Sequence, residues 1–171
     1  FYNEQLVIEN VGAKGADLIQ QRLLSEYPQI ELVFLIGKGS NGAKGLAIAR
    51  HLRAVGFNMR AFMLYPHSEC NEELIEQARI AESFGVKLNF IENFDQLSSY
   101  FEQLHGQVAV VDAIFGTTVQ LPLSNFIYDV IKYINEFSSF TVAVDIPSGV
   151  EGDTGFIQGN AIEADLTLSI A

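Results

Sequence analysis

The sequence predicts a three-layer α/β/α fold of the Rossmann-like kind, with a mostly parallel central sheet. Two observations support this class. Apolar runs of strand length, rich in β-branched residues, alternate along the chain with amphipathic segments of helix length. The apolar runs are almost uninterrupted, as in "ELVFLI" and "VAVV", which is typical of parallel strands that helices cover on both faces.

The first half of the chain is predicted to begin with a helix at residues 3–27, where apolar side chains recur at roughly helical spacing up to a proline. A buried strand, a helix closed by a glycine and a second strand stopped by a proline are then expected at 31–37, 41–56 and 58–66. The second helix is therefore expected to start directly behind a glycine-rich loop.

The same alternation continues in the second half of the chain. Asn71 is a suitable N-cap for a helix at 71–85, which a glycine closes. The apolar segment 163–171 is expected to add a last strand. Between these two segments we expect strands at 86–91, 107–116 and 140–149, and helices at 93–106 and 123–137.

Length and composition indicate one domain. With 171 residues, 49% of them apolar, the chain is long enough to bury one substantial core. We therefore expect a single domain at 1–171. Because the chain starts without Met and ends on an apolar run, truncation at either end or excision from a longer chain stays open.

Charge and cysteine content restrict the partners and the compartment. A net charge of −11 would repel a nucleic-acid backbone or an anionic membrane surface, so we expect neither as a partner. No run of 18 apolar residues and no basic leader is present, so we expect no membrane span and no signal peptide. The single Cys70 excludes an internal disulfide and is typical of a reducing compartment, which favours a cytoplasmic protein.

The loop after the first predicted strand, "GKGSNGAKG", holds four glycines in nine residues. Gly37, Gly39 and Gly42 match G-x-G-x-x-G between a strand and a helix, where backbone amides can hold an anion. However, the acid that usually binds ribose hydroxyls at the end of the second strand is missing from "LYPHS", and Lys44 comes one residue too late for a P-loop. The glycines alone leave two interpretations open, an anion site or a tight turn with close helix packing.

Two aspartates end predicted strands, Asp112 in "VAVVD" and Asp145 in "TVAVD". Both carboxylates are expected at the same edge of the sheet as the glycine loop, because the carboxyl ends of parallel strands meet there. Carboxylates in that place favour an active site, although an N-cap or a hydrogen bond that braces a loop would also account for them. Ser148 in "DIPSG" would offer oxygen atoms to a cation or ligand, whereas the three histidines lack the spacing of a zinc site.

Taken in order, these motifs resemble a known family. "VIENVGAKGADLI", the glycine loop, "VVDAIFG", "VAVDIPSGV" and "ADLTLSIA" follow one another as in the YjeF N-terminal domain family, the NAD(P)HX epimerases. The resemblance covers essentially the whole chain, and "DIPSG" about thirty residues after "DAIFG" is its specific part. It implies a Rossmann-like isomerase that interconverts the R and S epimers of NADH or NADPH hydrated at C6. It also implies a bound potassium ion and an ADP- or ATP-dependent dehydratase, either as a pathway partner or as a fused domain. A homodimer is one assembly compatible with the resemblance.

The resemblance also implies roles for individual positions. By the resemblance, potassium would be held by Asn41, Asp112 and Ser148. We take Asp112 as the candidate for the catalytic acid or base, because it is a carboxylate at the edge of the sheet beside this ion site. The substrate would be bound by residues of three loops: Ser40, Asn41, Gly42, Ala43, Lys44, Gly116, Thr117, Thr118, Val119, Gln120, Leu121, Pro122 and Asp145. Carboxylate, amide and hydroxyl oxygens are suitable ligands for a hard cation.

Two loops differ from the family pattern. The family usually has Asn-Asn-Gly-Gly-Asp-Gly where this chain has "SNGAKG", so Lys44 replaces an acid and Ala43 adds a methyl group. In "GTTVQLP", Thr118 and Gln120 stand where the family usually has a glycine and a basic residue. A nucleotide-binding or dimerising scaffold domain that has lost catalysis therefore stays open as a second function. A third is an unrelated Rossmann-like oxidoreductase, which would bind intact NAD(H).

Overall fold

The central sheet has six parallel strands in the order β3-β2-β1-β4-β5-β6. The structure is a computed structural model that describes residues 3–118, 122–157 and 159–169. The parallel α/β class predicted from the sequence is confirmed. The strands are β1 (Glu31–Ile36), β2 (Met59–Met63), β3 (Lys87–Phe90), β4 (Val108–Ala113), β5 (Phe140–Val144) and β6 (Leu166–Leu168).

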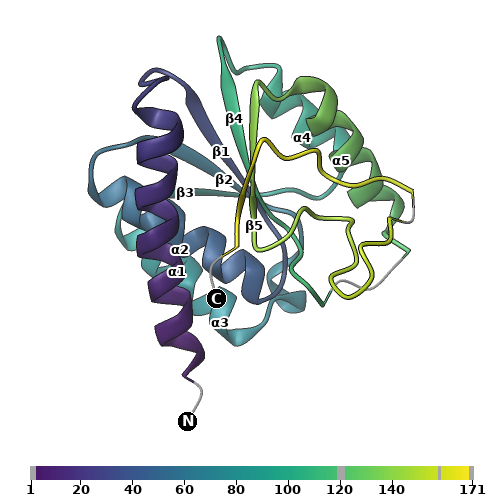
Figure 1. The fold of residues 1–171 in the computed structure, drawn as a ribbon, viewed down its shortest axis with the longest axis horizontal. Coiled ribbons are helices and arrows are strands. Elements are labelled where there is room, and N and C mark those ends of the chain that lie inside the picture. Colours follow the sequence, from purple (N-terminus) through teal and green to yellow (C-terminus); the bar gives the residue numbers. More distant parts are fainter. Residues whose placement is uncertain (1–2, 119–121, 158, 170–171) are drawn as a thin grey trace.

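Helices cover both faces of this sheet, as Figure 1 shows. Three helices, α1 (Glu4–Ile19), α2 (Ser40–Ala54) and α3 (Glu72–Ser83), lie on one face. Two others, α4 (Phe94–Phe101) and α5 (Asn125–Phe137), lie on the opposite face. The expected three layers are therefore present.

Alternate residues of each central strand supply the two halves of the core. In β1, Phe34 and Ile36 pack beneath α1, α2 and α3, whereas Val33 and Leu35 pack beneath α4 and α5. This alternation follows from the pleat of the strand, which turns successive side chains to opposite faces. Because both faces are covered, both sets are apolar, and this is why the strands could be recognised as continuous apolar runs.

Four of the five described α-helices start at a capping side chain, and α2 starts behind Gly39. Asn3, Asn71, Asn93 and Ser124 each accept a hydrogen bond from a backbone N–H in the first turn of the helix that follows. The prediction of Asn71 as an N-cap is confirmed: its side-chain oxygen accepts from the N–H of Leu74 at 3.0 Å.

Several element boundaries differ from the prediction. The α-helix expected over 3–27 ends at Ile19 and continues as a π-helical turn, η1 (Gln20–Leu24). The helix expected over 93–106 ends at Phe101, and the strand expected over 140–149 ends at Val144. The last strand is limited to 166–168. Periodicity places the apolar face of an element more reliably than its ends, since capping and loop contacts decide where it stops.

The strand order places the reversal of the sheet between β1 and β4. From β1 the chain moves outward to β2 and β3, then returns to pair β4 with the other side of β1. In such sheets the loops after the two central strands separate and leave a crevice at the carboxyl edge. None of the described helices is long and apolar enough to cross a membrane.

Gly45 sets how closely α2 approaches the sheet, because a Cβ on Gly45 would overlap the Cβ of Ala113 in β4. Ala113 is fixed by the strand and has no flexible side chain to move aside. We expect Gly45→Ala to lower the free energy of unfolding by about 2 kcal/mol, since crowding a packed core outweighs the better helix propensity of alanine. Urea denaturation measures this change. Lys14→Ala, at an exposed position of α1, is the control and should stay within about 0.5 kcal/mol; equal stability of both variants would contradict the packing argument.

Candidate functional site

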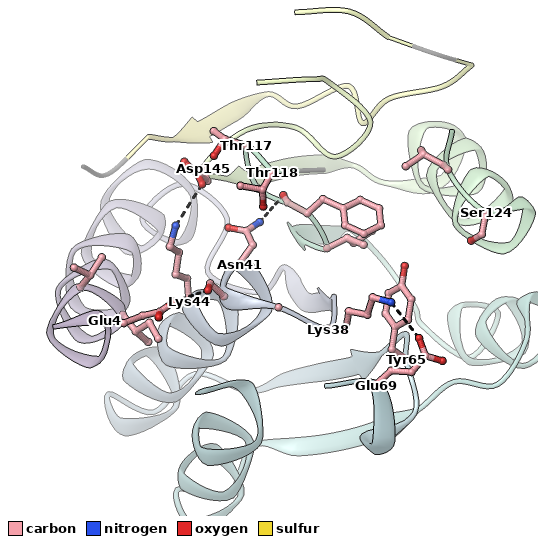
Figure 2. A pocket seen from close by; sticks show the side chains of 18 of the residues that line it. Glu4, Lys38, Asn41, Lys44, Tyr65, Glu69, Thr117, Thr118, Ser124 and Asp145 are labelled. Carbon is pink, nitrogen blue, oxygen red and sulfur yellow. Dashed lines mark hydrogen bonds and ion pairs between the residues drawn. The ribbon is translucent and has the colours of Figure 1, made fainter. Parts of the chain in front are cut away.

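A cavity of about 820 Å³ opens at the carboxyl edge of the sheet, over β1 and β4. Its walls come from the loops after β1, β2, β4 and β5 and from the first turns of α1 and α2 (Figure 2). The volume lies within the range that small-molecule and cofactor sites usually have. This is the place where a parallel sheet with such a reversal binds its ligand.

Asn41, in the first turn of α2, ties three of these loops together. Its Nδ2 donates to the carbonyl oxygen of Phe115 at 2.6 Å and to that of Val144 at 3.0 Å. These two bonds fix the orientation of the amide and leave Oδ1 buried without a hydrogen-bond partner among the described residues. A buried unpaired oxygen is costly, so this atom is available to a ligand or cation.

Asp112, near the end of β4, braces the loop that carries Ser148. Its Oδ1 accepts from the Ser148 hydroxyl at 2.6 Å and from the N–H of Ile114 at 3.1 Å, and its Oδ2 accepts from the N–H of Ser148 at 2.8 Å. The Ser148 hydroxyl in turn accepts from the N–H of Phe115 at 3.0 Å. Asn41, Asp112 and Ser148 are thus joined through the Phe115 peptide.

The Asp112 carboxyl is completely buried, below the cavity rather than in its wall. Burial raises the pKa of this carboxyl to about 6, and the hydrogen bonds from Ser148 and Ile114 only partly oppose the shift. Such a pKa lets a carboxyl exchange a proton near neutral pH, which is a property of catalytic acids and bases.

Asp145, directly after β5, does line the cavity. Its Oδ2 lies 3.3 Å from the Nζ of Lys44, and the two side chains are 25% and 19% exposed. Asp145 has a φ of 75°, which no other described non-glycine residue approaches. A left-handed aspartate costs conformational energy and is typical of functional sites.

In the glycine-rich loop, some glycines allow close packing and another lies at the possible anion site, so both interpretations of the sequence apply. A Cβ on Gly37 would overlap the backbone of Ile114, and one on Gly42 would overlap the carbonyl of Gly37, so these two glycines allow the loops to approach each other. Gly39, by contrast, has open space around its Cα and lines the cavity as the N-cap residue of α2. The first N–H groups of a helix have no partner within the helix, so the N-terminus of α2 in the cavity wall is suited to an anion.

Most of the site residues suggested by the sequence come together here. The cavity is lined by Ser40, Asn41, Lys44, Gly116, Thr117, Thr118, Pro122 and Asp145. Gly42 and Ala43 are buried in the first turn of α2 and do not line it, and Asp112 and Ser148 lie beneath it. Val119, Gln120 and Leu121 lie outside the described residues.

The cavity also contains charged residues that the sequence analysis missed. Glu4 of α1 accepts a hydrogen bond from the Ser40 hydroxyl at 2.5 Å. On the opposite side, Lys38 donates to Glu69 at 3.1 Å and its Nζ lies 4.9 Å from the centre of the Tyr65 ring. Capping could have suggested Glu4, but Glu69 reaches the cavity only through a turn that has no sequence signature.

The described residues contain no group of three or more His, Cys, Asp or Glu side chains that could hold a metal. The possible cation ligands around the Phe115 peptide are instead oxygen atoms of mixed type. They are one carboxylate, one amide oxygen without a partner among the described residues, one hydroxyl and backbone carbonyls. With a single negative charge, this set fits a monovalent hard cation better than a zinc ion.

Comparisons with known proteins agree with this geometry. Residues 4–171 match the protein family described as YjeF-related protein N-terminus. An NAD(P)H-hydrate epimerase of Rhodopirellula baltica is 32% identical over 166 residues, which are 97% of this chain and 65% of that protein. A bifunctional NAD(P)H-hydrate repair enzyme Nnr of Thermofilum pendens is 33% identical over 166 residues, 97% of this chain and 31% of that protein.

Two further comparisons cover larger shares of the other protein. An NAD(P)H-hydrate epimerase of Limosilactobacillus fermentum is 30% identical over 176 residues, 98% of this chain and 80% of that protein. The crystal structure of yeast ynu0 superposes with a TM-score of 0.81 at 23% identity, covering 98% of this chain and 71% of that chain, which supports the fold. The chain thus spans about two thirds of the Rhodopirellula protein and about one third of the Thermofilum protein.

The pKa of Asp112 predicts a pH dependence of stability. Folding raises this pKa from 3.8 to about 6, so the folded state binds the proton more tightly than the unfolded state does. Protonation of Asp112 therefore stabilises the folded state fully below about pH 4, and this stabilisation is lost as the pH rises through 6. The loss amounts to about 3 kcal/mol. In urea denaturation from pH 4 to 7, wild type should therefore lose stability relative to Asp112→Asn, which cannot titrate. Parallel stability curves for the two proteins would show that Asp112 titrates normally in the folded state.

Proposed function

The chain belongs to the YjeF-related N-terminal family, and from this premise we propose that it epimerises hydrated nicotinamide nucleotides, converting the R and S forms of NAD(P)HX into each other. The observation that carries the proposal is the convergence of the loops after β1, β4 and β5 on one cavity at the sheet reversal. The printed names of the Rhodopirellula and Limosilactobacillus relatives describe the same activity.

The substrate would lie across the loops after β1 and β4. Gly39 and Ser40 present the N-terminus of α2, where a phosphate is favoured by free N–H groups and the helix dipole. Lys44 adds a positive charge beside Asp145. Thr117 and Thr118, from the loop after β4, add hydroxyl groups to the lining of the cavity. Together these groups suit an anionic, hydroxyl-rich ligand inside a protein that is acidic overall.

Epimerisation at C6 needs only proton transfer and reversible bond cleavage. A base takes the proton of the C6 hydroxyl while the bond between C6 and the ring nitrogen breaks and that nitrogen takes up a proton. Rotation of the resulting aldehyde and ring closure give the other epimer. Asp112 is proposed as the acid or base of this exchange, since its pKa of about 6 suits both directions; because it lies beneath the cavity, the proton would reach it through a relay of hydrogen-bonded groups rather than by direct contact with the substrate.

We propose potassium as the bound ion, held by Asn41, Asp112 and Ser148. The unpaired Oδ1 of Asn41 supports this assignment. Asp112 accepts three hydrogen bonds, so its carboxylate keeps one further lone-pair position, which the ion would occupy only while the carboxyl is ionised. When bound, the ion would supply a positive charge close to the substrate and would hold the loops after β1, β4 and β5 in place.

The remaining partners follow from the same proposal. An ADP- or ATP-dependent dehydratase would act on the S epimer, either as a separate protein or as a fused domain, and the name of the Thermofilum relative describes a bifunctional enzyme. A cytoplasmic location, assembly as a homodimer and a substrate that is hydrated NADH or hydrated NADPH belong to this proposal as well.

The epimerase proposal is tested with a mixture of both epimers and a dehydratase specific for the S form. We expect the wild-type protein to let the dehydratase consume the whole mixture at a rate well above spontaneous epimerisation. Asp112→Asn should slow this conversion at least about a hundredfold, since it removes the proton-exchanging group. Asp129→Asn, an exposed aspartate of α5, is the control and should keep the wild-type rate.

The possible outcomes separate the alternatives. If the R epimer remains although the wild-type protein is present and binds nucleotide, the scaffold function replaces the epimerase. If Asp112→Asn keeps full activity while Asp145→Asn loses it, the acid or base is Asp145, the carboxylate in the cavity wall.

The potassium proposal is tested by thermal denaturation in potassium chloride and in choline chloride at equal ionic strength. We expect potassium to raise the midpoint of the wild-type protein by about 3 °C, since an ion that binds only the folded state stabilises it. Asn41→Ala should abolish this response. Asn135→Ala is the matched control, because Asn135 also bridges backbone groups, those of Ala161 and Glu163, away from the cavity. An equal midpoint of the wild-type protein in both salts would argue against the ion site.

A further inference from the structure

We propose that Lys38 and Glu69 bind the adenosine ribose of the substrate, Glu69 through the free hydroxyls of NADHX and Lys38 through the 2′-phosphate of NADPHX. The inference rests on the proposed function, because it assumes a dinucleotide ligand. According to this inference, the ion pair of Lys38 and Glu69 at the edge of the cavity determines whether NADHX or NADPHX is preferred.

The two side chains meet at the end of the cavity near β2. Lys38 follows β1, whereas Glu69 belongs to the short 3-10 turn η2 (His67–Glu69) behind β2. Their charged groups are 3.1 Å apart, and Figure 2 shows both on the side of the cavity opposite Lys44 and Asp145. One end of the cavity thus carries Lys38 and Glu69, and the other carries Lys44, Asp145 and Glu4.

The position of this pair corresponds to that of the ribose in doubly wound folds. There the pyrophosphate lies at the N-terminus of the helix after the first strand, and an acid after the second strand binds the adjacent ribose. The sequence directly after β2, "LYPHS", lacks such an acid. The turn η2 supplies one a few residues later, because it bends the chain back so that Glu69 lines the cavity.

The backbone on both sides of the pair is held in place. The carbonyl of Lys38 accepts from the N–H of Asn71 at 3.0 Å, which joins the loop after β1 to the N-cap of α3. The N–H of Glu69 donates to the carbonyl of Pro66 at 2.9 Å. The half-buried ring of Tyr65 packs against the core and supports the Lys38 ammonium group. A subsite with fixed backbone loses little entropy when it binds its ligand.

The side chains themselves remain free to exchange partners. Lys38 is 48% exposed and Glu69 is 49% exposed, so water and salt weaken their ion pair. A ribose with free hydroxyls can donate hydrogen bonds to Glu69 without disturbing Lys38. A 2′-phosphate would be repelled by Glu69 and attracted by Lys38, so it would draw the ammonium group away from the carboxylate.

The two residues should therefore have opposite effects on the two ligands. Isothermal titration calorimetry with ADP-ribose and with 2′-phospho-ADP-ribose measures this without any catalytic step. Lys38→Met should weaken binding of the phosphorylated ligand about tenfold and change binding of ADP-ribose less than about twofold. Glu69→Gln should weaken ADP-ribose and leave the phosphorylated ligand equal or tighter.

Two further variants complete the experiment. Lys38→Arg should restore affinity for the phosphorylated ligand, since it restores the charge. Lys87→Met removes an exposed lysine of β3 that does not line the cavity and should match wild type with both ligands. The inference is overturned if Lys38→Met affects both ligands equally or neither, or if the wild-type protein binds neither ligand.

The epimerisation assay keeps this result separate from the proposed function. Opposite effects on the two ligands in a protein that does not epimerise would support the ribose site and reject the activity. Full epimerisation by a protein without these opposite effects would support the activity and reject the ribose site.

Discussion

The Phe115 peptide holds the site together. Its carbonyl accepts from Asn41, and its N–H donates to Ser148, which is held by Asp112. Three residues, Asn41 after β1, Ser148 after β5 and Asp112 in β4, are thereby held around the backbone of Phe115. Both polar groups of the Phe115 backbone, which is partly buried, therefore have a partner within the protein.

Burial of Asp112 links the stability of the fold to the proposed chemistry. The carboxyl that supports the Ser148 loop is completely buried, and this burial raises its pKa. The same raised pKa suits proton exchange at neutral pH. One residue can therefore brace a loop and take part in catalysis, so these two interpretations of Asp112 do not exclude each other.

The fold could be predicted from the sequence because its strands are covered on both faces and its helices have visible caps. The residues around "SNGAKG" and "DIPSG" were predicted to share one edge of the sheet, and Asn41, Asp145 and Ser148 do so. Lys38 and Glu69 could not be found in this way. They come from different segments, and they meet only because of how η2 turns the chain. Such a pairing depends on three-dimensional placement, whereas capping and strand patterns are local in sequence.

The left-handed backbone of Asp145 has an evolutionary consequence. Glycine would adopt this φ of 75° at lower cost, so a change to glycine would relieve strain at the price of the carboxylate facing Lys44. Selection for stability alone would tolerate glycine at this position, whereas selection for what the cavity binds would keep the acid. The residue found at 145 in variants under different selective regimes therefore reports whether the cavity is still in use.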